Sequence, residues 1–145
     1  MTASPGPPGP GHAGLQPLSR EDCVTLLASA PIGRVVFTDQ ALPAVQPVAF
    51  AVDGDHIVIR AAGGSRLAGA IVAFQVDAFD PVTRTGWSVT ALGRARAVRD
   101  AAEADRLSRL PMTVWAHDAE DHYVVIPAER LTGRRVHPGL PRQDG

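Results

Sequence analysis

Residues 43–62 read PAVQPVAFAVDGDHIVIRAA, two strand-like runs on either side of an Asp53-Gly54 pair. An Asp-Gly pair between two runs rich in β-branched residues is typical of a tight hairpin turn. The two runs are therefore predicted to form paired antiparallel strands. Pro43 and Pro47 have no backbone N–H to donate, so the first strand is expected to lie at a sheet edge or to contain a bulge.

The same patterns along the rest of the chain predict a mainly β, antiparallel fold with two or three short helices. The six expected strands cover residues 33–38, 43–53, 56–62, 71–79, 86–98 and 122–136. Ser19 has an acidic residue three positions later, which predicts an N-capped helix over 20–29. Asp100 with Glu103 predicts a second helix in the same way, and a brief helical turn is expected at 65–70.

The length of 145 residues indicates one folded domain. Residues 1–14 and 138–145 are rich in proline and glycine, so they are predicted to be flexible tails around a domain at 15–137. No apolar run approaches the roughly 18 residues of a membrane span. The N-terminal residues do not have the pattern of a secretory signal, and the single cysteine fits a reducing, cytoplasmic location.

The formal net charge is −1, which argues against nucleic acid or an anionic membrane as a partner. All 14 basic residues are arginine, so a Schiff-base lysine and a P-loop lysine are excluded. Guanidinium groups bind phosphate well through paired N–H donors. The histidines do not show the spacing of a zinc site, and no nucleophile motif is present. We therefore predict no metal site and assign no catalytic residue.

The stretch AAGGSRL at 61–67 joins a predicted strand to a predicted helical turn. Its two glycines permit positive φ angles, while Ser65 and Arg66 provide a hydroxyl and a guanidinium. With a helix N-terminus behind them, these groups are suited to hold a phosphate, and Arg60 adds a second positive charge. The alternative is a plain glycine turn with a solvated arginine, because the pattern is neither a P-loop nor a Rossmann fingerprint.

The stretch GWSVTALGRARAV at 86–98 alternates with period two, as in a strand. Trp87 and the small residues after it lie on one side, and Ser88 lies on the other. A tryptophan at this place is a core or dimer contact in the ordinary case, and a platform for a flat cofactor in the alternative. The small residues would let another strand or subunit pack closely.

Several segments together resemble the pyridoxamine 5′-phosphate oxidase-like flavin-binding split barrels, in particular the small actinobacterial branch grouped with nitroimidazole-resistance proteins. The matching segments are PIGRVVFTD, LPAVQPVAFAVDGDHIVIRAAGGSRL, VAFQVDAFDPVTRTGWSVTALGRARAV and VVIPAERLTGRRV, within residues 18–136. The resemblance implies a six-stranded split β-barrel that forms a homodimer, with FMN in clefts at the interface. It also implies an oxidoreductase that transfers hydride to or from a small molecule.

The resemblance also implies where the cofactor binds. The strand segment beside the flavin ring would be Pro47, Val48 and Ala49. The ribityl and phosphate side would be lined by Arg60, Ala61 and Ala62 at the end of the next strand, and the phosphate would be held by Ser65 and Arg66. The partner subunit would contribute Trp87 and Ser88. Relatives often have lysine at the position of Arg66. The C-terminal substrate-binding segment of true pyridoxamine phosphate oxidases has no clear match here, so vitamin B6 oxidation is not inferred.

The sequence leaves two other interpretations of the function open. A deazaflavin-dependent reductase on the same barrel would need a basic groove, for which Arg84, Arg94 and Arg96 are candidates. A non-catalytic flavin- or haem-binding module is the second reading. Haem needs an axial ligand, and His56 and His122 are the candidates within the folded region.

Overall fold

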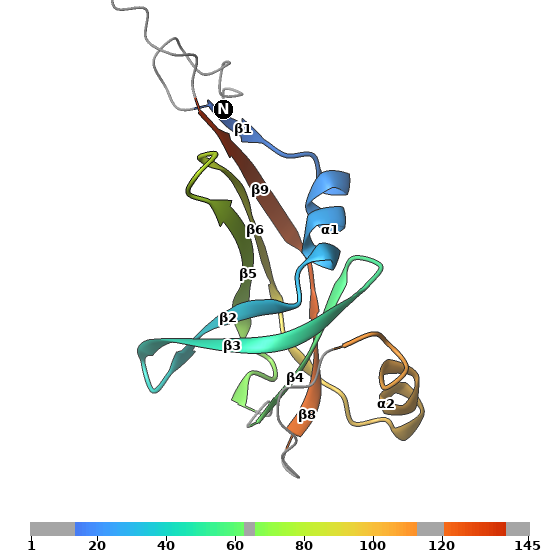
Figure 1. Ribbon diagram of the computed structural model, residues 1–145. Coiled ribbons are helices and arrows are strands. Elements are labelled where there is room, and N and C mark those ends of the chain that lie inside the picture. Colours follow the sequence, from blue (N-terminus) through green and yellow to red (C-terminus); the bar gives the residue numbers. More distant parts are fainter. Residues whose placement is uncertain (1–13, 63–65, 113–120, 139–145) are drawn as a thin grey trace, which may run out of the picture.

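The computed structural model describes residues 14–62, 66–112 and 121–138 (Figure 1). Within these ranges the elements are β1 (Gly14–Pro17), α1 (Arg20–Ser29), β2 (Ile32–Asp39), β3 (Leu42–Asp53), β4 (His56–Ala62), β5 (Ile71–Asp80), β6 (Thr85–Arg94), β7 (Arg96–Ala97), α2 (Ala101–Leu107), β8 (Asp121–Pro127) and β9 (Arg130–His137). The strands pair in the order β1-β9-β6-β5-β2-β3-β4-β8-β7, and each pair is antiparallel. The mainly β class is confirmed.

The expected count of six strands is wrong, since the described residues form nine, and the sheet is not closed into a barrel. The strand predicted at 86–98 is two strands, because Ala95 leaves the ladder and its N–H donates to the Ala70 carbonyl at 2.8 Å. The strand predicted at 122–136 is also two, separated at Ala128 and Glu129. The structure also contains β1, a strand that the sequence did not predict and that pairs with β9.

The predicted hairpin is confirmed. Asp53 pairs with His56 across a two-residue turn, and Gly54 has the positive φ of 64° that such a turn requires. β3 pairs with β4 only over its last four residues, so among the described strands Pro43 and Pro47 pair only with β2. The expectation of an edge position for these prolines is therefore confirmed.

β1, β9, β6 and β5 lie side by side as an elongated blade, and the β2–β3 hairpin crosses its lower end (Figure 1). α1 packs against β9, β3 and β6. Its predicted start is confirmed, because the Ser19 hydroxyl accepts a hydrogen bond from the Asp22 N–H at 3.1 Å. α2 begins in the same way, with the Asp100 carboxylate accepting from the Glu103 N–H at 3.3 Å.

One face of the strands and one side of α1 enclose the main core. Phe50 and Phe74 meet edge to face at its centre, with ring centroids 4.8 Å apart. Cys23 on α1 is fully buried in this core, where Gly133 leaves room for its sulfur. Burial raises the pKa of the Cys23 thiol, and the nearby Asp22 carboxylate raises it further. Cys23 therefore acts as a small buried hydrophobe in this fold.

A smaller cluster lies on the opposite side of β4 and β8, where Leu107 of α2 packs on Val58 and Val125. Two ion pairs join α2 to the sheet. Arg96 holds Glu103 through two N–H···O contacts of 2.6 and 3.0 Å, and Arg106 lies 2.9 Å from Asp53. The hydrogen bonds from Arg96 hold the pKa of Glu103 below its ordinary value.

A depressed carboxylate pKa makes the stability of this contact depend on pH. Because the folded state favours ionised Glu103, the contribution is present above the unfolded-state pKa and is lost as pH falls through the folded-state pKa. At neutral pH, Glu103→Gln is expected to lower the free energy of unfolding by about 0.5–1 kcal/mol, the scale of an exposed pair with good geometry.

The measurement is urea unfolding of both proteins from neutral pH down to about pH 3.5, below the ordinary glutamate pKa. The difference between them should shrink on acidification. A difference that stays constant over this range would contradict a role for the charge. Asp105→Asn, which removes the more exposed i,i+4 pair with Arg109, is the matched control and should have the smaller effect.

Candidate functional site

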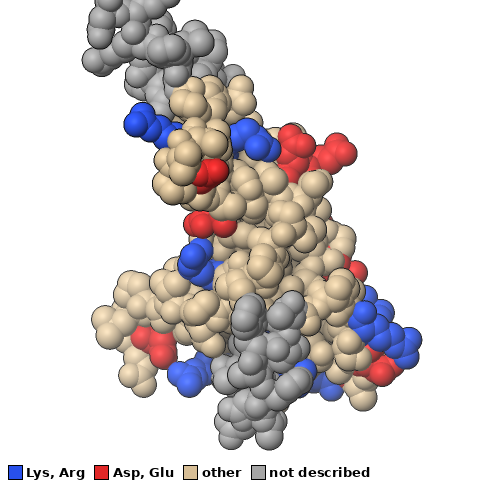
Figure 2. Space-filling view, viewed as in Figure 1, with Lys and Arg blue, Asp and Glu red and all other residues tan. Residues whose placement is uncertain are grey.

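Strands β3, β2, β5 and β6 present a second face, directed away from the core, which we call the outer face. By strand register it is formed by alternate residues, each exposed or half-buried: Arg34, Val36, Val45, Pro47, Ala49, Ile71, Ala73, Gln75, Asp77, Phe79, Ser88, Thr90 and Leu92. In the space-filling view, charged side chains are scattered and separated by broad uncharged surface (Figure 2).

Several large apolar side chains of the outer face are left in solvent. Val45 is 61% exposed, Ile71 is 55% exposed and Phe79 is 57% exposed. They belong to β3 and β5, two strands separated in the sheet only by β2. By register, Val45 lies in one row with Val36, Ala73 and Leu92, and Ile71 is beside this row, whereas Phe79 lies further along β5, beyond Gln75 and Asp77. Exposed apolar side chains grouped on a sheet surface are candidates for a site of interaction.

A polar network crosses the middle of the outer face. An Arg34 N–H donates to the Gln75 side-chain oxygen at 3.1 Å, and the Gln75 amide donates to Asp77 at 2.7 Å. Arg34 also lies 3.5 Å from the Asp77 carboxylate. In the register, Arg34 is opposite Pro47 and Asp77 is opposite Ser88. The network thus joins β2 to β5, the two strands that lie between Pro47 on β3 and Ser88 on β6.

The three predicted residues of β3 divide between the two faces. Pro47 and Ala49 lie on the outer face, while Val48 is only 5% exposed and belongs to the core. A ligand on the outer face can therefore touch the side chains of Pro47 and Ala49, but it reaches Val48 only through the backbone. The small side chains of Pro47 and Ala49 leave a shallow floor along β3.

The predicted phosphate residues lie at and after the end of β4. The Arg60 guanidinium lies 5.5 Å from the centre of the Tyr123 ring, on the strand that pairs with β4. Ala61 and Ala62 end β4 with their backbones paired to β8, and Ser65 lies outside the described residues. Arg66 is highly exposed, and one of its N–H groups is 3.5 Å from an Asp39 carboxylate oxygen.

Trp87 and Ser88 lie on opposite faces of β6. Trp87 packs against the edge of the main core, whereas Ser88 is on the outer face. Ser88 is separated from Pro47 by three strand spacings, which corresponds to about 14 Å within one chain. The structure therefore does not bring Ser88 to Pro47 of the same chain, and it places Trp87 on the other side of the sheet.

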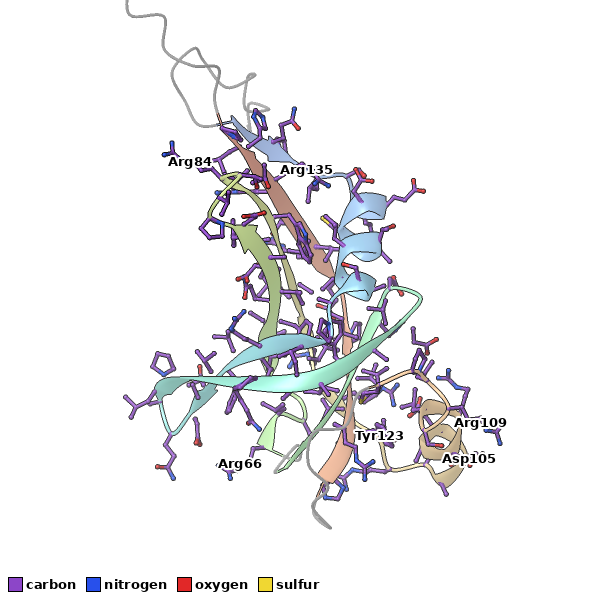
Figure 3. All side chains as sticks on the ribbon, viewed as in Figure 1. Arg66, Arg84, Asp105, Arg109, Tyr123 and Arg135 are labelled. Carbon is purple, nitrogen blue, oxygen red and sulfur yellow. The ribbon has the colours of Figure 1, made fainter. Side chains whose placement is uncertain are left out.

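Trp87 lines a hollow of about 390 Å³ near the upper end of the blade. Arg135, which is opposite Trp87 in the register, and His137 contribute polar groups to it. Arg135 is labelled in Figure 3 near this end, close to the β5–β6 turn that carries Arg84. Neither Arg135 nor His137 was singled out by the sequence, because an alternating Arg-x-His pair gives no motif of its own.

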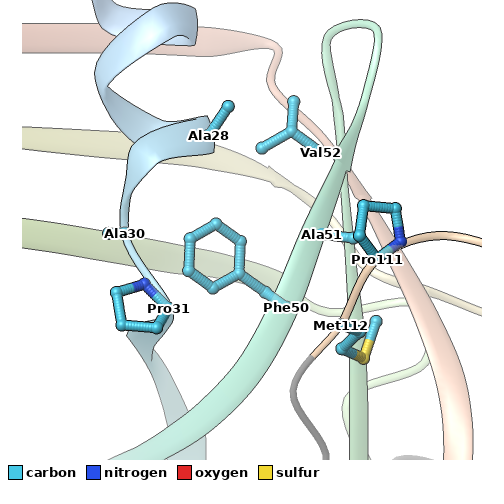
Figure 4. A pocket seen from close by; sticks show the side chains of 8 residues that line it. All are labelled: Ala28, Ala30, Pro31, Phe50, Ala51, Val52, Pro111 and Met112. Carbon is cyan, nitrogen blue, oxygen red and sulfur yellow. The ribbon is translucent and has the colours of Figure 1, made fainter.

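A second hollow, of about 350 Å³, follows β3 beyond Ala49 and is lined only by apolar residues. It lies between the end of α1 and the segment that follows α2. The close-up shows the Phe50 ring beside Pro31, with Pro111 and Met112 across the opening (Figure 4). Ala51 continues the floor of Pro47 and Ala49 into this space.

The residues of the alternative readings are dispersed. Arg94 and Arg96 line one hollow, but Arg84 lies in the turn at the far end of β5 and β6 (Figure 3). His56 pairs with Asp55 at 3.0 Å beside the β3–β4 turn, and His122 is exposed on β8. In the part of the chain that the structure describes, no three His, Cys, Asp or Glu side chains are grouped for a metal ion. Within the same residues no helix is long and apolar enough to cross a membrane.

The sequence did not identify the Arg34–Gln75–Asp77 network or the Tyr123 ring beneath Arg60. A usable signal existed, since Arg34 and Asp77 are charged residues on strands whose neighbours are mostly apolar. The pairing of β2 with β5 joins segments about 40 residues apart, and only this pairing brings the three side chains together.

Comparisons with known proteins match most of the chain. A family model described as pyridoxamine 5′-phosphate oxidase matches residues 19–135. An uncharacterized protein of Mycobacterium tuberculosis is 40% identical over 134 residues, which cover 82% of this chain and 84% of that protein.

Solved structures share both the fold and part of the sequence. A candidate pyridoxamine 5′-phosphate oxidase from Corynebacterium glutamicum has a TM-score of 0.75 and 28% identity, covering 85% of this chain and 98% of its own. The FAD-binding protein from Mycobacterium smegmatis has a TM-score of 0.71 and 31% identity, covering 83% of this chain and 97% of its own.

Proposed function

Because the chain belongs to the pyridoxamine 5′-phosphate oxidase family, we propose that it is a flavin-dependent oxidoreductase that binds FMN on the outer face and acts on a small molecule. What supports this proposal is the shallow floor of Pro47 and Ala49 on β3, together with Arg60 on β4, the strand that pairs with the end of β3, and Arg66 in the segment that follows β4. A flat ring needs such a floor, and a phosphate needs guanidinium groups at one end of it.

The residues present fit a flavin phosphate. Arg66 is highly exposed, and only one of its five N–H donors has a contact among the described residues, at the 3.5 Å limit of a hydrogen bond. The remaining donors are available to a phosphate. Arg60, stacked near the Tyr123 ring, places a second positive charge at the end of β4.

A bound flavin supplies the electron chemistry, by transfer of hydride at its ring. The chain would contribute binding, orientation and exclusion of water, which agrees with the lack of an acid–base pair at the site among the described side chains. The apolar hollow beyond Ala49 is the space next to the proposed ring position. We propose that it receives an uncharged, largely apolar part of the substrate.

The proposal includes a homodimer formed through the outer face. Support for this comes from the exposed apolar side chains of this face, Val45 and Ile71 on one side of the Arg34–Gln75–Asp77 network and Phe79 on the other, whose burial would favour association. Dimerisation would also cover the flavin and would bring Ser88 of one chain to the site of the other. In such a dimer, the flavin site of one chain would receive Ser88 from the other chain, although within a single chain Ser88 and Pro47 are about 14 Å apart.

The cofactor is tested on the purified protein by its absorption spectrum and by mass spectrometry of the released small molecule, and the dimer is tested by sedimentation. We expect a flavin spectrum, the mass of FMN and the mass of two chains. Release of FAD, the flavin that the M. smegmatis relative binds, would correct the identity of the flavin. A deazaflavin mass or a haem Soret band would replace the proposal with one of the alternatives. A protein that takes up no flavin on reconstitution would refute it.

The phosphate assignment makes a sharper prediction. Arg66→Ala is expected to weaken FMN binding by about 1–3 kcal/mol, the range of a hydrogen bond to a charged group. Arg109→Ala is the matched control, because Arg109 is equally exposed and also pairs with an aspartate, but lies on the side of α2 (Figure 3). The measurement is titration of flavin-free protein with FMN. Equal affinities for the two variants would remove Arg66 from the site.

A further inference from the structure

A further hollow, of about 510 Å³, lies at the junction of β6 and β7. Its lining is Ala68, Gly69, Arg94, Ala95, Arg96, Ala97, Arg99, Pro127 and Glu129. It shares no residue with the proposed flavin floor. The volume lies within the range of about 300–1,000 Å³ that small-molecule sites occupy.

The floor of this hollow is fixed by backbone hydrogen bonds. The Gly69 N–H donates to the Ala95 carbonyl and the Ala95 N–H donates to the Ala70 carbonyl, each at 2.8 Å. Gly69 has a φ of 81°, which turns the chain here at little steric cost. The apolar side chains of the lining are three alanines and a proline, of which Ala95 is buried in the main core. Small apolar side chains of this kind are suited to contact with the face of an aromatic ring.

Three arginines reach the hollow, and they differ in how far they are already engaged. Arg96 is held by Glu103 through both of its terminal nitrogens, so it forms a wall and its charge is largely neutralised. Arg94 donates one N–H to the Gly69 carbonyl at 2.6 Å and keeps its other donors. Arg99 is exposed and has no hydrogen bond or ion pair with any described residue.

We propose that this hollow binds the adenosine diphosphate group of a nucleotide, with the phosphates on Arg94 and Arg99 and the ring on the alanine and proline floor. Two guanidinium groups with unused donors suit a diphosphate, because each can form paired N–H···O bonds. Glu129 is the one acidic side chain of the lining, and it leaves the lining with an excess of positive charge. Ala68 is two residues from Arg66, so the hollow lies close in sequence to the proposed flavin phosphate site. An adenosine diphosphate group could therefore come from FAD or from a nicotinamide dinucleotide.

The inference does not depend on flavin binding, and its test uses the flavin-free protein. Calorimetric titration is performed with ADP, pyrophosphate and adenosine. ADP is expected to bind more tightly than either fragment, and added salt should weaken its binding. Arg99→Gln is expected to weaken ADP binding by about 10-fold, as for loss of a charge-assisted contact, and it breaks no contact among the described residues.

Arg84→Gln is the control, since it makes the same charge change at the opposite end of the molecule (Figure 3). Equal ADP affinity in the wild type, Arg99→Gln and Arg84→Gln, or no binding at all, overturns the proposal. Pyrophosphate binding as tight as that of ADP overturns the nucleotide assignment. Displacement of ADP by FAD or by NADH distinguishes the two sources. FMN affinity reports separately on the proposed flavin site, so failure of one proposal is not mistaken for failure of the other.

Discussion

Replacing Gly93 with alanine is expected to lower the free energy of unfolding by about 3 kcal/mol or more, at the upper end of the cost of overpacking a core. Gly93 is buried on β6 where it passes the end of β8, and a Cβ atom there would meet the carbonyl oxygen of Pro127. A backbone carbonyl at the end of a paired strand cannot rotate away as a side chain can. β6 and the end of β8 would have to move apart at this crossing.

The position of the obstacle makes the prediction specific. Because the first added carbon already meets the backbone, Gly93→Ala should cost nearly as much as Gly93→Val. Urea unfolding monitored by tryptophan fluorescence measures both. Gly54→Ala is the matched control, since Gly54 has nothing within 4 Å of the added carbon and only its positive φ is affected. That substitution should cost about 1–2 kcal/mol. A Gly93→Ala protein as stable as Gly54→Ala would contradict the close approach.

Local signals in the sequence predicted the local structure well. The cap at Ser19 fixed the start of α1, and the Asp53-Gly54 pair located the β3–β4 turn, because each depends on a few neighbouring residues. The breaks in two predicted strands escaped prediction. Alternation continues through Ala95, but its backbone bonds go to a loop 25 residues earlier. β1 likewise depends on β9, more than 100 residues away.

In the candidate site, too, local signals predicted some features, and others depend on strand pairing between distant segments. Alternation alone predicted that Trp87 and Ser88 face opposite sides, and the structure confirms this. The side with Trp87 is also the apolar side of this alternation, and it is the side that faces the core. The register with β5 decides this, since it sets Val89 and Ala91 against the buried Val76 and Phe74.

The second large effect is expected at Phe74. Phe74→Ala should lower the free energy of unfolding by about 3–5 kcal/mol, because it removes a fully buried ring that contacts Phe50 at the centre of the core. Gly33 lies directly against the same ring, so the space left behind has no flexible side chain on that side to fill it. With a typical total of about 5–15 kcal/mol, this loss leaves a marginal protein. Urea unfolding measures the change.

Phe79 on the same strand is the matched control, and it links stability to the proposed function. Its ring lies on the outer face and is 57% exposed, so Phe79→Ala should lower the stability of the folded chain by only about 1 kcal/mol. If the outer face is the dimer interface, however, Phe79→Ala should weaken dimer formation in sedimentation at low protein concentration. Phe74→Ala protein that remains folded should keep its dimer, because Phe74 does not reach that face. The opposite pattern would mean that the outer face is not where two chains meet, and Ser88 would then have no route to a shared flavin site.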